Sequence, residues 1–86
     1  MGGRTSILIV EDERDLSELI RINLEREGFA CRCAADGRQA VESLRRDPPD
    51  LVILDRMLPG VSGDEVLRRI RSNAKTAALP VLMLTA

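Results

Sequence analysis

The chain has 86 residues, enough for one small domain. Its 13 Lys and Arg residues nearly balance 14 Asp and Glu residues, for a formal net charge of -1, and this balance argues against direct contact with nucleic acid. No apolar run approaches the roughly 18 residues that a membrane span needs, so we expect no membrane partner and a cytoplasmic location.

The first half of the chain alternates between apolar runs and amphipathic segments. The run from Ile7 to Val10 is continuous and stops at two acids, which predicts a strand buried on both faces. Leucine and isoleucine at 16, 19, 20 and 24 then recur with helical spacing, and Gly28 marks the end of that helix. Residues 29–34 predict a second strand, after which Asp36 offers an N-cap for a second helix.

The second half repeats this alternation. Residues 51–55 form another apolar run that ends in an acid, and a loop rich in Gly and Pro follows it. Ser62 and Glu65 then stand at the spacing of a capping box, which predicts a third helix. Pro80 opens the last apolar run, a fourth strand. Alternating strands and helices predict an α/β fold, with a parallel sheet between helices on both faces.

Three acids stand at the ends of two predicted strands. Glu11 and Asp12 follow the first strand and Asp55 ends the third, and ligands of open parallel sheets bind beyond the carboxyl ends of the strands. If these strands are neighbours, the carboxylates converge and cannot all stay ionised without a cation, for which Mg²⁺ is the best fit. Asp55 would then be free to attack phosphorus. The alternative is structural: Asp55 caps a loop, and the other two acids complement a helix N-terminus.

Three blocks, "ILIVEDE", "DLVILDRMLPGVSG" and "LPVLMLTA", occur in an order and spacing that resemble the receiver domain of bacterial two-component response regulators. The resemblance covers residues 6–86 and is strongest to receivers fused to winged-helix DNA-binding domains, which implies transcription regulation as the output. It implies a flavodoxin-like, three-layer fold with strand order 2-1-3-4 in a single domain, residues 1–86. It also implies that Asp55 accepts a phosphoryl group from a histidine kinase, stoichiometrically and not as an enzyme.

The same resemblance implies a role for each residue of the site. Asp12 and Asp55 would ligate Mg²⁺ directly, and the backbone carbonyl of Met57 would supply another ligand. Glu11 would assist the metal through water. Thr85 matches the family's hydroxyl that hydrogen-bonds the phosphoryl group.

The family's receivers continue beyond the position that matches residue 86, with a fourth helix, a fifth strand ending in a lysine that contacts the phosphoryl group, and a fifth helix. The sequence therefore predicts a C-terminally truncated receiver whose fourth strand has an unpaired edge. The family's fifth helix would cover the same face of the sheet as the first helix, so we expect part of the apolar surface of Ile53, Leu82 and their neighbours to lie open to solvent. We expect such a chain to form a homo-oligomer through the edge of the fourth strand, or else to be a partly molten monomer.

Two other functions stay open. A phosphatase of the haloacid-dehalogenase type also uses a strand-end aspartate and Mg²⁺, but it needs a second acid two residues after the nucleophile, where this chain has Met57. A truncated receiver that acts as a non-signalling interaction or dimerisation module is the third candidate. Phosphorylation separates the receiver from the interaction module, and turnover of a generic phosphomonoester would identify the phosphatase.

Overall fold

The computed structural model describes residues 3–84, which fold around one parallel sheet. The strands are β1 (Ser6–Val10), β2 (Ala30–Ala34), β3 (Leu51–Asp55) and β4 (Val81–Leu84), and the helices are α1 (Arg14–Arg26), α2 (Gly37–Arg46) and α3 (Gly63–Ser72). The strand order is β2-β1-β3-β4, and all neighbouring strands are parallel. The predicted α/β fold and the predicted strand order are confirmed.

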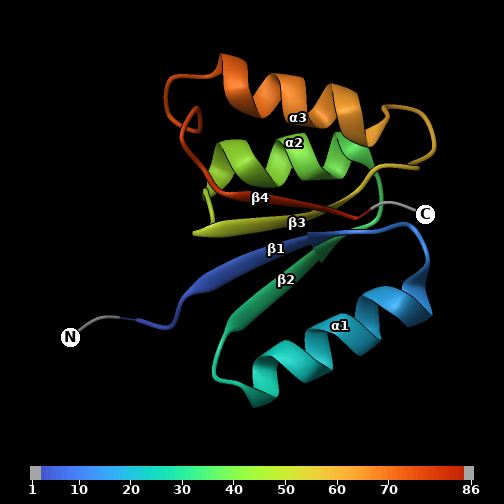
Figure 1. The fold of residues 1–86 in the computed structure, drawn as a ribbon, viewed down its shortest axis with the longest axis vertical. Helices are drawn as coiled ribbons and strands as arrows, with labels where there is room; N and C mark the ends of the chain where they lie inside the picture. Colours follow the sequence, from blue (N-terminus) through green and yellow to red (C-terminus); the bar gives the residue numbers. More distant parts are fainter. Residues whose placement is uncertain (1–2, 85–86) are drawn as a thin grey trace.

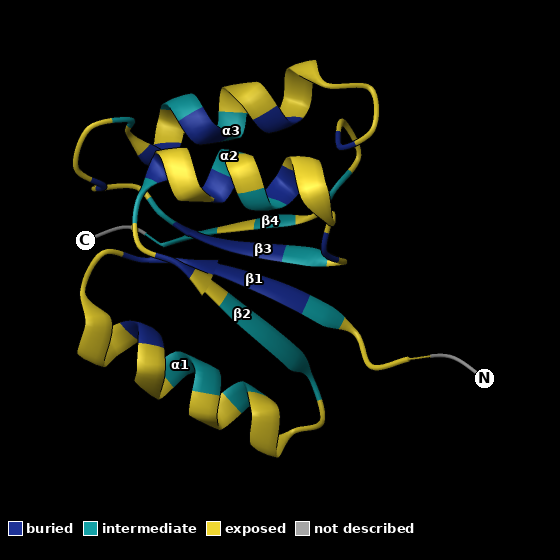
Figure 2. Ribbon diagram, turned by 180° about the vertical axis from the view of Figure 1, so that it is seen from behind, coloured by how far each residue is buried: buried dark blue, intermediate teal, exposed yellow. Residues whose placement is uncertain are grey.

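The molecule has three layers (Figure 1). Helices α2 and α3 lie side by side on one face of the sheet and α1 lies on the other. The core under α2 and α3 contains Leu8, Val10, Val52 and Leu54 from the sheet. Strand β1 lies between two other strands and is largely buried, as Figure 2 shows. Because neither of its faces meets solvent, its sequence is a continuous apolar run and does not alternate between apolar and polar residues.

Side-chain caps begin α2 and α3 where the sequence predicts them. The carboxylate of Asp36 accepts a hydrogen bond from the backbone N–H of Gln39 at 2.8 Å, and the hydroxyl of Ser62 accepts one from the backbone N–H of Glu65 at 3.2 Å. The predicted capping box is only half formed, because the carboxylate of Glu65 bonds to arginines instead of reaching back to Ser62. Helix α1 ends just before Gly28, whose φ of 97° suits glycine alone.

The α1 face of the sheet is covered less completely than the opposite face. Leu82 is 54% exposed, as predicted, whereas Ile53 is only 7% exposed. The prediction for Ile53 is wrong because this side chain packs with Ile7 and Ile9 in a second buried cluster. The apolar stripe of α1 is likewise only partly buried, since Leu19 faces solvent.

None of the helices in the described part of the chain is long and apolar enough to cross a membrane.

The exposed ion pairs of α3 make stability depend on pH. Hydrogen bonds from Arg68 and Arg69 lower the pKa of Glu65 from 4.5 to about 2. A carboxyl group whose pKa is lower in the folded state stabilises the fold fully above its unfolded pKa, and this contribution is lost as pH falls toward the folded pKa. We expect Glu65→Gln to reduce the fall in the free energy of unfolding between about pH 5 and pH 2, measured by urea titration. Glu42→Gln, at an exposed glutamate of α2, is the control; an equal change in both variants would contradict the expectation.

Candidate functional site

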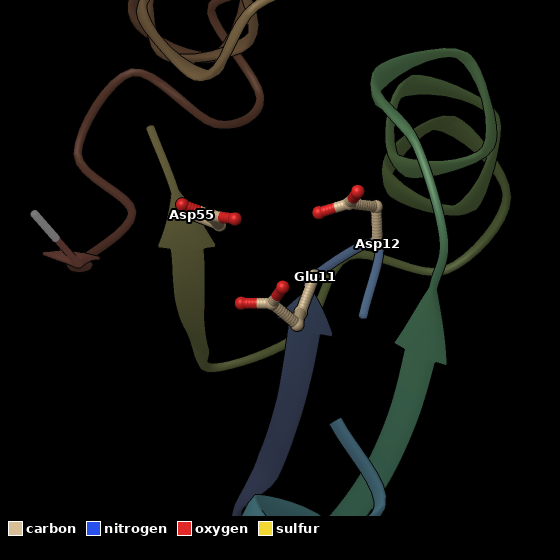
Figure 3. A group of neighbouring side chains, drawn as sticks. All are labelled: Glu11, Asp12 and Asp55. Carbon is tan, nitrogen blue, oxygen red and sulfur yellow. The ribbon is translucent and has the colours of Figure 1, made fainter. Parts of the chain in front are cut away.

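Three carboxylates meet at the carboxyl edge of the sheet (Figure 3). Glu11 and Asp12 directly follow β1, and Asp55 is the last residue of β3. Because β1 and β3 are paired neighbours, their acidic ends lie side by side. One carboxylate oxygen of each residue lies within 4.8 Å of those of the other two. The three acids that the sequence places at strand ends therefore form one cluster.

Glu11 is the buried member of this cluster, with only 5% of its surface exposed. One carboxylate oxygen accepts a hydrogen bond from the backbone N–H of Glu13 at 3.0 Å. Burial raises the pKa of Glu11 above its usual 4.5, the negative charges of Asp55 and Asp12 raise it further, and the bond from Glu13 only partly opposes this. The folded protein thus disfavours the third negative charge of the cluster, and a bound cation would relieve this penalty.

Asp55 is half-buried and is oriented by the loop that follows it. One oxygen of its carboxylate, Oδ1, accepts a hydrogen bond from the backbone N–H of Met57 at 3.0 Å. Met57 itself is 70% exposed, so its side chain contributes little to the core, and its link to the cluster runs through the backbone. The loop is closed where the backbone N–H of Gly63 donates to the carbonyl of Arg56 at 3.0 Å.

The donor set suits a hard divalent cation. All three clustered side chains offer carboxylate oxygens, and the 86-residue sequence has no histidine. Oxygen ligands with room for water are typical of Mg²⁺, whereas nitrogen and sulfur ligands favour the transition metals. Asp12 is exposed and Asp55 half-buried, so one side of the cluster is open to solvent and to an incoming ligand.

One predicted site residue lies outside the described part of the chain, and the structure adds two backbone groups that the sequence analysis did not predict. Thr85 lies outside the described residues, directly after Leu84, which pairs with Asp55; its role stays a prediction. Sequence reasoning missed the backbone N–H groups of Glu13 and Met57, each of which donates to an acid two residues earlier. The available signal was the spacing itself, because acidic side chains at turns often accept from the backbone two residues on.

Comparison with known proteins identifies the family. Residues 7–86 match the sequence model of the response regulator receiver domain. The chain belongs to this family. The phosphate regulon transcriptional regulatory protein PhoB of Rhizobium meliloti (strain 1021) is 52% identical to it over 80 residues, which are 93% of this chain and 35% of PhoB. The chain thus spans about a third of this curated relative.

Solved receiver structures share the fold. The N-terminal domain of a response regulator receiver protein from Methanoculleus marisnigri JR1 has a TM-score of 0.91 and 41% identity, covering 94% of this chain and 66% of the other. A putative response regulator from Chloroflexus aurantiacus J-10-fl has a TM-score of 0.91 and 34% identity, covering 93% and 66%. Receivers are signalling modules of response regulators, and the chain is a receiver of this family.

The cluster predicts a measurable response to Mg²⁺. A ligand present at 100 times its Kd stabilises the folded state by about 2.7 kcal/mol. We expect Asp12→Asn to gain clearly less from Mg²⁺ than the wild type, because it loses one carboxylate, and to be at least as stable without metal, because repulsion falls. Urea titrations with and without Mg²⁺ measure both effects. Asp15→Asn, an exposed aspartate of α1 outside the cluster, is the matched control and should respond as the wild type does.

Proposed function

We propose that this chain is the phosphoacceptor receiver of a two-component response regulator, with Asp55 as the acceptor and a histidine kinase as the donor. The observation that supports this most strongly is the cluster of three carboxylates at the carboxyl edge of the sheet, in a chain of the receiver family. We assign residues 1–86 to one receiver domain that acts in the cytoplasm.

The position of Asp55 suits nucleophilic attack on phosphorus. One of its oxygens, Oδ1, is held by the backbone N–H of Met57, so the other is free to attack. A bond forms between this oxygen and phosphorus while the bond from phosphorus to the donor nitrogen breaks, which yields an aspartyl phosphate. The phosphohistidine belongs to the kinase, because this chain has no histidine. In this proposal the chain accepts one phosphoryl group per transfer, as a stoichiometric acceptor.

The surrounding residues would bind the metal ion and the phosphoryl group. Asp12, Asp55 and the backbone carbonyl of Met57 would hold Mg²⁺, and Glu11 would contact it through water. When bound, Mg²⁺ would offset negative charge on the transferring phosphoryl group. Burial raises the pKa of Glu11, and the charges of Asp55 and Asp12 raise it further; a cation bound beside it would favour its charged form, which supports this assignment. Thr85, assigned by resemblance, would hydrogen-bond the phosphoryl oxygens.

The output is proposed from the relatives. PhoB is named as a transcriptional regulatory protein, and this chain matches 35% of its length. We propose a role in transcription regulation for the regulator to which this receiver corresponds. Direct contact between this chain and nucleic acid is not proposed, because its net charge is -1.

The acceptor assignment is tested by labelling. The chain is incubated with acetyl phosphate and Mg²⁺, and the mass increase of one phosphoryl group is followed by intact mass spectrometry. We expect the wild type to be labelled and Asp55→Asn to be inert, because an amide is not a nucleophile toward phosphorus at neutral pH. Asp15→Asn should be labelled as the wild type is. Equal labelling of Asp55→Asn would show that the acceptor lies elsewhere, and turnover of a generic phosphomonoester would favour a phosphatase.

A second candidate, a self-associating interaction module, is favoured by the surface of β4. This strand is at the edge of the sheet and pairs only with β3 among the described strands. Its Leu82 is 54% exposed. An edge strand with free backbone groups and an exposed apolar side chain is a pairing site. We propose a second copy of the chain as the partner, through antiparallel pairing of the two β4 edges, since identical edges meet in a closed two-fold dimer.

Sedimentation equilibrium tests this association. We expect the wild type to form dimers at high concentration, and Leu82→Lys to shift the equilibrium to monomer because a charged edge opposes pairing. Ile22→Lys changes a comparably exposed apolar residue on α1 and should form dimers to the same extent as the wild type. A wild type that stays monomeric, or a Leu82→Lys chain that still forms dimers, would count against the module.

A further inference from the structure

We propose that Gly63, supported by Gly37, is a positioning residue of the site: the absence of a side chain at these positions seats the loop 56–62 so that Asp55 and the backbone of Met57 are correctly oriented. The inference rests on the proposed role of Asp55 and extends it to residues that neither bind nor react. The loop connects β3 to α3 and begins directly after Asp55.

Gly63 is in closer contact with the site than any side chain would allow. A Cβ atom at Gly63 would lie 2.3 Å from the carbonyl oxygen of Asp55 and 2.7 Å from the Cα of Arg56. Carbon atoms without a bond between them pack at about 3.5 to 4 Å. Both neighbours are backbone atoms, so rotation of a side chain cannot relieve the overlap. The amino end of α3 therefore lies directly against the peptide that joins Asp55 to Arg56.

This contact is joined to the site by two hydrogen bonds. The backbone N–H of Gly63 donates to the carbonyl of Arg56 at 3.0 Å, and the backbone N–H of Met57 donates to Oδ1 of Asp55 at 3.0 Å. Arg56 and Met57 share a peptide group. A shift of the Arg56 carbonyl therefore moves the Met57 N–H and changes how it holds the carboxylate of Asp55.

Gly37 also lies against this loop. A Cβ atom at Gly37, the first residue of α2, would lie 2.7 Å from both the Cβ and the carbonyl oxygen of Val61. The other described glycines, Gly3, Gly28 and Gly60, would meet nothing within 4 Å. Among the described glycines, Gly37 and Gly63 are thus the two whose added Cβ would collide with neighbours, and those neighbours are Val61 of the loop and the peptide between Asp55 and Arg56, where the loop begins.

A role in folding alone is the competing explanation. It predicts that Gly63→Ala lowers stability and leaves the site of the remaining folded molecules unchanged. A positioning role predicts a displaced Met57 amide and weaker metal binding in molecules that are folded. The two are separated by a control that is destabilised without altering the contacts of Gly63 with Asp55 and Arg56, and Val66→Ala serves, because Val66 is fully buried on the same helix.

The experiment compares the wild type, Gly63→Ala and Val66→Ala by NMR, since the chain has no tryptophan or tyrosine for fluorescence. Two readouts are taken: the chemical shift and hydrogen exchange of the Met57 amide without metal, and the Kd for Mg²⁺ from a titration. We expect Gly63→Ala to shift and deprotect the Met57 amide, and to weaken Mg²⁺ binding by about 10- to 100-fold, the range seen when groups that orient metal ligands are removed. Val66→Ala should match the wild type in both the Met57 amide and the Kd for Mg²⁺.

The Met57 amide and the Kd together decide between the two explanations. If Gly63→Ala keeps the wild-type Met57 amide and the wild-type Kd, the inference is overturned. If the wild type itself does not bind Mg²⁺, the proposed metal site fails, but the Met57 amide still decides the positioning role. If Gly63→Ala does not fold, Gly37→Ala is measured in the same way, and an unchanged Met57 amide in that variant would overturn the inference.

Discussion

The parallel pairing of β1 with β3 is the interaction on which the site depends. Val10 lies opposite Leu54 in this pair. Glu11 follows Val10 and Asp55 follows Leu54, so the two acids lie close together. Val10 and Leu54 are fully buried, and burial of each such side chain contributes about 1.5 to 3 kcal/mol. Apolar packing behind the site thus holds together carboxylates that repel one another, and burial together with the charges of Asp55 and Asp12 raises the pKa of Glu11.

Backbone groups, more than side chains, complete the geometry of the site. The N–H groups of Glu13 and Met57 each bind one carboxylate of the cluster, and they are held by the turns that leave β1 and β3. A backbone donor has little freedom to move once its strand and helix are packed. In our proposal the orientation of Asp55 therefore depends on how closely α3 approaches β3, which Gly63 permits.

The helices cover the two faces of the sheet to different extents. Helices α2 and α3 cover their face with a continuous core, and this side anchors the strands that carry the acids. On the other face α1 covers a smaller cluster, and Leu82 remains exposed beside it. Exposed apolar surface next to an edge strand favours association, so the face that contributes least to the core is the one suited to meet a partner.

The sequence by itself determined the element types and the acids at the strand ends, because uninterrupted apolar runs, cap residues and strand-end charges are local signals. The strand order was implied by the resemblance to the receiver family. Asp36, Ser62 and Gly28 end or begin helices for reasons contained in a few neighbouring residues. Only the tertiary structure decided that Ile53 is buried while Leu82 is exposed, since Ile53 packs with Ile7 and Ile9 of the neighbouring β1, whereas Leu82 lies on the edge strand β4. The same holds for the contacts of Gly37 and Gly63, because a glycine looks alike in sequence whether open space or another backbone lies beside it.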